Sequence, residues 1–209
     1  MPGKITIVDY GLGNVGSVLN MLRYLGVEAE SSADPCEIDR ADKLILGGVG
    51  AFDAGMERLH ARGLVDPLNE AVMGRGVPVL GICLGMQLMT ERSEEGSMNG
   101  LRWVPGEAVR FRDQGTATRL RIPHMGWNEV RILRDCPLAD GLPSDSRFYF
   151  VHSYHVVCRD GADVVATTEY GGTCCAMLQK GRIFGTQFHP EKSHRFGMTV
   201  LRNFASMVA

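Results

Sequence analysis

The hydrophobic pattern divides the chain into two halves, and the first half alternates short apolar runs with stretches of helical periodicity. Residues 4–9 predict a strand, and Val15, Val18 and Leu22 then recur on one face of a helix expected over 15–25. The same pattern predicts further strands at 27–31, 43–46 and 77–82 and helices at 53–61, 66–74 and 84–91. Strands that alternate with helices favour a mostly parallel central sheet with flanking helices.

The second half follows a polar loop at 92–100, is rich in runs typical of strands, and ends in a helix expected near 195–207. The expected strands lie at 101–104, 108–111, 119–122, 129–133, 148–157, 164–168, 174–179 and 182–187. No stretch is long enough to act as a linker between two domains. We therefore predict a single α/β domain over residues 1–209, with an antiparallel β extension added to the mostly parallel sheet.

Composition narrows the classes of partner. The 209 residues are 44% hydrophobic and 22% charged, and their formal net charge is -2. This near-neutral charge argues against a nucleic-acid partner, which usually requires a strongly basic surface, and it gives no indication of a membrane partner. The sequence shows no run of about 18 apolar residues and no signal-peptide pattern. We therefore expect a cytoplasmic location.

The cysteines raise the question of which thiol is chemically special. The chain has 6 cysteines, at positions 36, 83, 136, 158, 174 and 175. They form no C-x-x-C pair and show no Cys/His spacing of the zinc-site type, so we expect free thiols and no metal. Most are expected to be small core residues.

A glycine motif near the start has two interpretations. Gly11, Gly13 and Gly16 form a literal G-x-G-x-x-G between the first strand and the first helix, and Glu30 follows at a spacing typical of a ribose-binding acid. Taken alone, the motif favours a dinucleotide site. However, the expected second strand is weakly apolar, and the chain leaves little room for a separate substrate domain. We favour the interpretation that these glycines only permit a tight turn.

The strongest candidate for chemistry is Cys83, at the corner between the buried strand at 77–82 and the following helix. Gly81 and Gly85 flank it with the G-x-C-x-G spacing of a nucleophile elbow. In such an elbow the sharp turn strains the nucleophile's backbone, and the glycines avoid collisions of Cβ atoms. The helix N-terminus also favours a thiolate. The alternative is a core thiol between two packing glycines.

A thiolate that attacks a carbonyl group needs a proton donor and acceptor, and His189 in the segment FHPEK is the candidate. Glu191 lies two residues further on, and Pro190 stiffens the connection, so that the carboxylate can hold the imidazole in one tautomer. The alternative interpretation is a capping histidine and a solvated glutamate before the last helix.

Acyl chemistry also requires hydrogen-bond donors for the developing oxyanion, and two sources are available. One is the backbone N–H of Leu84, which follows the candidate nucleophile. The other is the glycine-rich loop at 47–52, GGVGAF, at the end of the strand at 43–46. Because the carboxyl ends of parallel strands meet at one edge of a sheet, this loop and the elbow are expected to converge. The loop is not a phosphate loop, because no G-K-[ST] follows.

Taken together, these segments resemble the class I (triad) glutamine amidotransferases. The resemblance spans nearly the whole chain and includes the order Cys, then His-x-Glu. Within that family, the chain is most similar to the glutaminase subunits of imidazole glycerol phosphate synthases, of histidine biosynthesis. The motifs that carry the resemblance are DYGLGN (9–14), GGVGAF (47–52), GICLGMQ (81–87), PHMGWN (123–128), FYFVHSYH (148–155) and FGTQFHPEKS (184–193).

The resemblance implies a flavodoxin-like core, a Cys83, His189 and Glu191 triad, and hydrolysis of L-glutamine to glutamate and ammonia through a thioester, with no cofactor. It implies oxyanion donors at Val49 and Leu84. The residues expected to line the glutamine pocket are Gly50, Leu84, Gln87, Ser153 and Tyr154. The implied partner is a (β/α)₈-barrel cyclase subunit that uses the ammonia in a heterodimer. The residues expected at the interface with it are Pro123, His124, Met125, Gly126, Trp127 and Asn128.

One departure and two alternatives stay open at this point. The family's usual P-G-V-G loop reads Gly47-Gly48-Val49-Gly50 in this chain, and the loss of proline is expected to loosen the loop. The first alternative is a class I amidotransferase of another pathway, which would share the triad but lack PHMGWN. The second is a non-catalytic nucleotide-binding module that uses the glycine motif at 11–16.

Overall fold

The chain is built around one large sheet, which the computed structural model shows within its described residues, 3–112 and 120–208. In this part of the chain eight strands pair in the order β2-β1-β3-β4-β13-β12-β11-β8. The five parallel strands are β2 (Ala29–Ser32), β1 (Ile5–Val8), β3 (Lys43–Gly48), β4 (Val79–Cys83) and β13 (Ile183–Thr186). The three antiparallel strands are β12 (Thr173–Lys180), β11 (Val164–Glu169) and β8 (Arg131–Ile132). The parallel part has the flavodoxin-like order, so the predicted fold class is confirmed.

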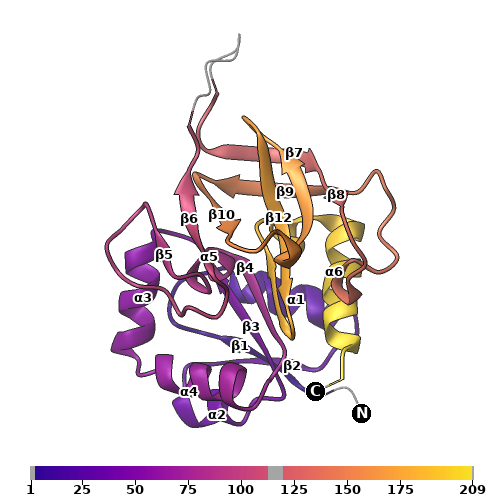
Figure 1. Ribbon diagram of the computed structural model, residues 1–209. Coiled ribbons are helices and arrows are strands. Elements are labelled where there is room, and N and C mark those ends of the chain that lie inside the picture. The colour runs from indigo at the N-terminus through magenta and orange to yellow at the C-terminus, as the bar shows by residue number, and fades with distance from the viewer. Residues whose placement is uncertain (1–2, 113–119, 209) are drawn as a thin grey trace.

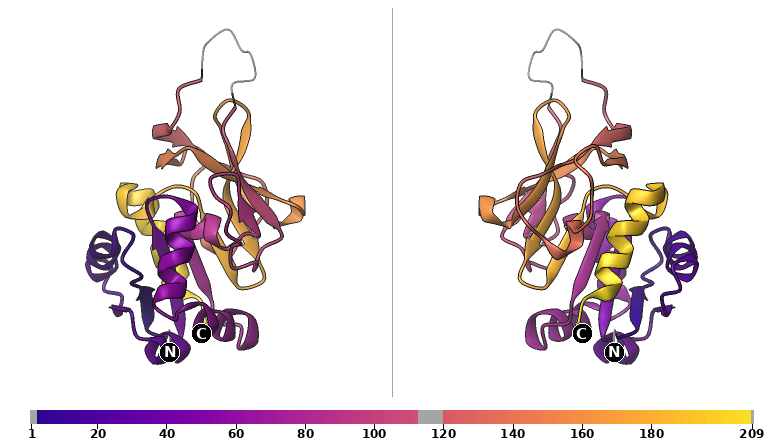
Figure 2. Two further views of the ribbon diagram at one scale, coloured as in Figure 1. Left: turned by 90° about the vertical axis from the view of Figure 1, so that its left-hand side faces the viewer. Right: turned by 90° about the vertical axis from the view of Figure 1, so that its right-hand side faces the viewer.

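Helices cover both faces of the parallel strands (Figure 2). The face with α1 and α6 buries Val18, Leu22, Val200 and Phe204 against Ile5, Ile45 and Leu80 of the sheet. The helices of this face are α1 (Val15–Tyr24) and α6 (His194–Ser206). The helical segments of the other face are α2 (Pro35–Asp39), α3 (Phe52–Ala61), α4 (Val65–Asn69), the π-helical turn η1 (Glu70–Gly74) and α5 (Leu84–Leu88). A parallel sheet needs this cover, because its strands are apolar on both sides.

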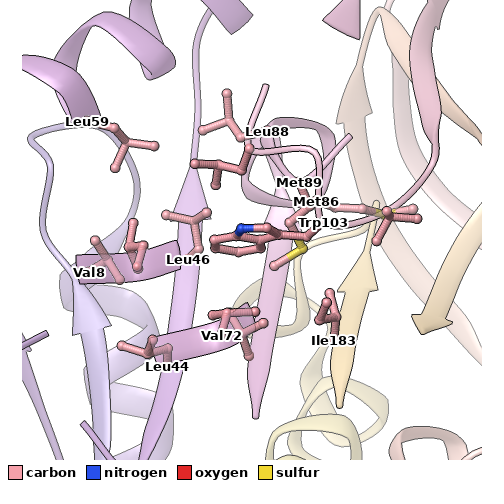
Figure 3. Close-up of a cluster of buried hydrophobic side chains, with 14 of the residues drawn as sticks. Val8, Leu44, Leu46, Leu59, Val72, Met86, Leu88, Met89, Trp103 and Ile183 are labelled. Carbon is pink, nitrogen blue, oxygen red and sulfur yellow. The ribbon is translucent and has the colours of Figure 1, made fainter. Parts of the chain in front are cut away.

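Trp103 is the largest fully buried side chain of the second face. Its indole lies among Leu46, Met86 and Met89 (Figure 3). The indole Nε1–H donates to Asn69 Oδ1 at 2.8 Å, so the polar edge of the ring is satisfied inside the core. The ring thereby packs the connection that follows α5 against Leu46 of β3.

Two small sheets lie beyond the carboxyl ends of β3 and β4, in the upper part of Figure 1. One pairs β10 with β6 and β6 with β5, and the other pairs β7 with β9 in antiparallel register. These strands are β5 (Arg92–Ser93), β6 (Gly106–Arg110), β7 (His124–Glu129), β9 (Arg147–His152) and β10 (Tyr154–Cys158). Three short 3₁₀ turns, η2 (Pro137–Ala139), η3 (Gly161–Asp163) and η4 (Pro190–Lys192), complete the described elements. The predicted antiparallel extension is thus divided between the large sheet and two separate ones.

The sequence pattern fails at three expected elements. The expected strand at 101–104 is wrong, because Leu101, Trp103 and Val104 donate backbone N–H groups to carbonyls at the end of α5 and just after it. The strand expected at 119–122 is also wrong over 120–122, while Arg119 lies outside the described residues. The single strand expected at 148–157 is two strands, β9 and β10, which break at Ser153 and join different sheets.

The helices of the described residues are short or amphipathic. None of them combines the length and the apolar character that a bilayer-spanning helix requires.

The packing predicts that Gly85→Ala strongly destabilises the fold. A Cβ at residue 85 would lie 1.6 Å from the carbonyl oxygen of Leu46, so β3 or α5 would have to move. We expect a loss of about 3 kcal/mol or more in the free energy of unfolding, measured in urea. Gly16→Ala is the matched control, because no heavy atom lies within 4 Å of its added Cβ. Equal stability of the two variants would contradict the packing argument.

Candidate active site

Cys83 occupies a sharp corner at the carboxyl end of β4. Its backbone has φ 54 and ψ -109, a left-handed conformation that is unusual for a residue other than glycine. Gly81 and Gly85 leave no room for a Cβ: one would meet Met86 backbone atoms at 2.8 Å, the other the Leu46 carbonyl. The predicted nucleophile elbow is therefore present in the structure. The helix that follows, α5 (Leu84–Leu88), is shorter than the expected span of 84–91.

His189 and Glu191 lie at the carboxyl end of β13, the strand next to β4. The two side chains are almost fully buried, and His189 Nδ1 lies 2.8 Å from Glu191 Oε1. Backbone contacts hold the segment in place: the His189 N–H donates to the Tyr149 carbonyl at 2.9 Å, and Ser193 Oγ donates to the His189 carbonyl at 2.6 Å. The imidazole is therefore fixed in orientation, with Nε2 as the nitrogen left for another partner.

Opposing effects act on the pKa of His189. Burial lowers this pKa, but the side chains of Cys83 and Glu191 raise it from 6.5 to about 9. Cys83 and Glu191 act on the imidazole through side-chain hydrogen bonds and charge, both of which favour its protonated form. At neutral pH the arrangement therefore favours a protonated His189 beside Cys83, which is the state in which a cysteine attacks a carbonyl carbon.

A cavity of about 410 Å³ opens beside Cys83, between the parallel sheet and the two small sheets. The candidate oxyanion residues Val49 and Leu84 lie on its wall, as do all four remaining residues expected to bind glutamine, Gly50, Gln87, Ser153 and Tyr154. The other lining residues are Cys83, Glu95, Pro123, Val151 and His152. The structure thus places Cys83 and the residues predicted for substrate and oxyanion binding around one space. Gly47 and Gly48 belong to β3, so the position of the missing proline lies in a strand and not in the loop.

Three polar residues of the site were not predicted from the sequence: Gln187, Glu95 and His152, of which His152 also lies on the cavity wall. Gln187 is fully buried; its Nε2 lies 3.8 Å from Cys83 Sγ, and its Oε1 accepts from Gln87 Nε2 at 3.2 Å. Glu95 is the only carboxylate on the cavity wall within the described residues. Its Oε2 accepts the Phe52 N–H at 2.8 Å, which anchors the loop of Glu95 to the start of α3. Gln187 belongs to the FGTQFHPEKS motif, two residues before His189, whereas Glu95 lies in a loop without any local signal.

The segment expected at a partner interface divides into inward and outward positions along β7. Met125 is 65% exposed and Trp127 is 48% exposed, and the Trp127 ring stacks on His194 with centroids 5.3 Å apart. His124 is buried instead, on the opposite face of the strand. Pro123 lies on the wall of the cavity. The outward side chains therefore form an apolar surface close to the site, which the inward histidine does not join.

The glycine turn at 11–16 packs against the carboxyl end of β3. A Cβ on Gly13 would lie 3.3 Å from the carbonyl oxygen of Gly47 and from Gly48 Cα, and Gly13 has φ 120. Glu30, the candidate ribose-binding acid, pairs with Lys4 Nζ at 2.5 Å. These contacts support the interpretation as a tight turn.

The other five cysteines do not share the environment of Cys83. All six are free thiols, as predicted. Burial raises the pKa of Cys174 to about 11, and that of Cys175 lies well above its usual value because of a hydrogen bond with Cys158 and burial. Cys36 is exposed on α2, and Cys136 is buried in the core.

Comparisons with known proteins agree with this geometry. The sequence profile of the family "Glutamine amidotransferase class-I" matches residues 6–208. The chain is 48% identical over 204 residues to "Imidazole glycerol phosphate synthase subunit HisH 2" of Pseudomonas aeruginosa, covering 98% of this chain and 100% of the relative. A protein of the same description from Methanococcus maripaludis is 48% identical over 200 residues, covering 96% and 98%.

Solved structures extend the similarity at the level of the fold. A putative GMP synthase protein from Thermoplasma acidophilum superposes with a TM-score of 0.73 at 22% identity, covering 98% of this chain and 93% of the other. The structure of PurLQS from Thermotoga maritima gives a TM-score of 0.71 at 18% identity and covers 98% of each chain. At these identities the likeness concerns the fold alone.

The geometry predicts that Glu191→Gln lowers the pKa of His189, because the variant loses the carboxylate charge that stabilises the imidazolium. An NMR titration of ¹³C-labelled histidine measures this pKa directly. Glu129→Gln is the matched control, since Glu129 pairs with Arg147 on the surface of β7 and β9.

The same shift has a consequence for stability. The pKa of His189 lies above its reference value of 6.5 in the folded chain. Protonation of His189 therefore stabilises the fold fully below pH 6.5, and this contribution disappears as the pH rises through about 9. A pKa of His189 that is the same in Glu191→Gln as in the unsubstituted chain would contradict this account.

Proposed function

Because the chain belongs to the class I glutamine amidotransferase family, we propose that it is a glutaminase subunit of an imidazole glycerol phosphate synthase, with Cys83, His189 and Glu191 as its catalytic triad. The observation that carries the proposal is the meeting of a strained cysteine, a buried His-Glu pair and a cavity of about 410 Å³ at one sheet edge. Residues 1–209 act as one domain in this proposal, and the protein works in the cytoplasm.

The first half of the reaction breaks the side-chain amide of glutamine. The Cys83 thiolate attacks the amide carbon and forms a tetrahedral intermediate with a negatively charged oxygen. The N–H groups of Leu84 and Val49 stabilise this oxyanion. His189 then transfers its Nε2 proton to the leaving nitrogen, the C–N bond breaks, and ammonia and a thioester are formed.

The second half releases glutamate. A water molecule attacks the thioester carbon, and the now neutral His189 accepts the water proton at Nε2. The C–S bond breaks, and Cys83 leaves as a thiolate beside a protonated His189, so the initial state is restored. Glu191 accepts the Nδ1–H hydrogen bond of His189 throughout and keeps this N–H pointed away from the substrate.

The polar groups of the cavity match the ends of a glutamine molecule. Gly50, Gln87, Ser153 and Tyr154 bind glutamine along the wall next to the reacting carbon in this proposal. Glu95 supplies a negative charge on the same wall, which suits the α-ammonium group of an amino acid. An apolar substrate would offer the charge of the Glu95 carboxylate no counterpart.

The partner in this proposal is the (β/α)₈-barrel cyclase subunit of the synthase, which receives the ammonia. The relatives are named as subunits of imidazole glycerol phosphate synthase, which implies a second subunit. Met125 and Trp127 offer exposed apolar side chains on β7, the strand that follows the cavity residue Pro123, as an interface with that subunit requires. A docked cyclase there would lie next to the site at which ammonia is released.

Replacing the nucleophile tests the reaction. We expect Cys83→Ala to lower the rate of glutamate release from glutamine by at least about 10⁴-fold, because no other group can form the thioester. An enzyme-coupled glutamate assay measures the rate, and circular dichroism checks the fold. Cys36→Ala is the control, since Cys36 is exposed on α2 and does not line the cavity. Unchanged activity in Cys83→Ala would assign the nucleophile to another residue.

Adding the partner tests the assignment to a synthase. We expect the isolated chain to release glutamate slowly and the complex with a ligand-bound cyclase to release it faster. Val49, one of the two proposed oxyanion donors, is exposed in the loop that follows β3, so docking next to this loop can improve the alignment of the Val49 N–H. Equal rates with and without the cyclase would remove the regulatory part of the proposal. If the cyclase and this protein do not co-purify, the proposed partnership is wrong.

A further inference from the structure

A chain of hydrogen bonds connects the inward face of β7 with the wall of the cavity. It begins at Asn128 and runs through His124 and His152 to the carbonyl of Tyr154. The distances are 3.3 Å from Asn128 Nδ2 to His124 Nε2, 3.1 Å from His124 Nδ1 to His152 Nε2, and 2.8 Å from His152 Nδ1 to the Tyr154 oxygen. Neither histidine belongs to the triad.

From the Tyr154 carbonyl, further hydrogen bonds lead to Cys83. Gln87 Nε2 donates to the same Tyr154 carbonyl at 2.8 Å and also to Gln187 Oε1 at 3.2 Å. Gln187 Nε2 in turn lies 3.8 Å from Cys83 Sγ. The Tyr154 carbonyl, at the start of β10, is therefore the point where the two histidines meet the groups that surround the thiol.

The partners determine which nitrogen of each ring carries a proton. A carbonyl oxygen only accepts, so His152 must donate from Nδ1, and its Nε2 is the accepting nitrogen of a neutral ring. His124 must then donate from Nδ1 to His152 Nε2. Its own Nε2 accepts from Asn128 Nδ2, whose second hydrogen bond goes to the Glu169 carbonyl at 2.9 Å. Every donor in the chain therefore faces an acceptor.

The buried surroundings of His124 and His152 favour neutral rings, and stacking holds the His124 ring in place. His124 is stacked between Phe150, with centroids 4.6 Å apart, and Tyr170, with centroids 3.9 Å apart. Burial lowers the pKa of His124 to about 4 and that of His152 to about 3. A charged ring would also lose its accepting nitrogen, and the row of hydrogen bonds would be interrupted at that ring.

We propose that His124 and His152 are positioning residues, which as neutral Nδ1–H tautomers hold the Tyr154 carbonyl against Gln87 and so fix the wall of the cavity beside Cys83. His152 lies on that wall, at the break between β9 and β10. His124 acts through His152 and joins the wall to β7, the strand that carries the outward Met125 and Trp127. The catalytic part of the inference rests on the proposed glutaminase function, but the tautomers do not.

The tautomers are tested on the unsubstituted chain by ¹⁵N-histidine NMR at pH 7. We expect His124 and His152 to carry a proton on Nδ1 and none on Nε2, with the signals assigned from single-site variants. His60, which is exposed on α3, serves as an internal reference outside the pair. A proton on Nε2 of either ring would overturn the proposal, whether or not the protein hydrolyses glutamine.

Kinetics test the positioning role. His124→Phe keeps an aromatic ring between Phe150 and Tyr170 but removes the donor to His152. We expect it to raise the KM for glutamine about three- to tenfold, the value of one hydrogen bond, with kcat changed less than about twofold. His124→Asn returns an N–H near the position of Nδ1 and is expected to restore much of the KM. Glu129→Gln, on the same strand but outside the chain of bonds, is the matched control.

The outcomes separate the possibilities. An unchanged KM in His124→Phe would overturn the positioning role. A raised KM that His124→Asn does not restore would show that the N–H donor at residue 124 does not set the KM and would also overturn the positioning role. If the unsubstituted chain releases no glutamate, the proposed function fails, while the NMR result still decides the hydrogen-bond chain.

Discussion

The contact between Gly85 and the carbonyl of Leu46 is the constraint on which the site depends. Because α5 starts directly against β3, the chain must turn within one residue, and Cys83 takes a left-handed conformation that costs about 1–3 kcal/mol. The ladder of β3, β4 and β13 holds this corner in place, and Trp103 belongs to the same buried cluster as Leu84 and Met86, the residues of α5 that follow the corner. Strand register then brings the loop after β3 and the histidine after β13 to the same edge as the thiol, and contacts with Tyr149, Ser193 and Glu191 orient that histidine.

The second constraint is the break at Ser153 between β9 and β10, which allows a pocket to form at the edge of the parallel sheet. If residues 148–157 formed one strand, the chain would continue past the elbow in a single sheet. Instead β9 pairs with β7 and β10 pairs with β6, so the two small sheets separate above Cys83. The polar groups at the break are satisfied from within, because Gln87 and His152 both donate to the Tyr154 carbonyl. A buried backbone carbonyl without such donors would be costly.

The sequence predicts what local patterns and the geometry of parallel strands determine. The parallel sheet, the elbow and the convergence of its neighbours at one edge follow from apolar periodicity, glycine spacing and the shared direction of the strands. Pairing between distant segments is not encoded locally. Residues 101–104 have the pattern of a strand, yet Trp103 is drawn into the core, and its backbone pairs with residues next to α5. Glu95 and the pair of His124 and His152 likewise acquire their surroundings only from the tertiary fold.

The groups that surround each buried histidine of the site determine its pKa, and thereby which of two roles it can have. Burial alone lowers the pKa of any histidine, as it does for His124 and His152, whose partners are an imidazole, an amide and a carbonyl. His189 is also buried, yet its pKa is raised, because a carboxylate and a thiol face it. Histidines whose pKa values lie on opposite sides of neutral pH can serve different functions. One histidine can therefore carry a proton while the other two hold their tautomers and keep the wall in place.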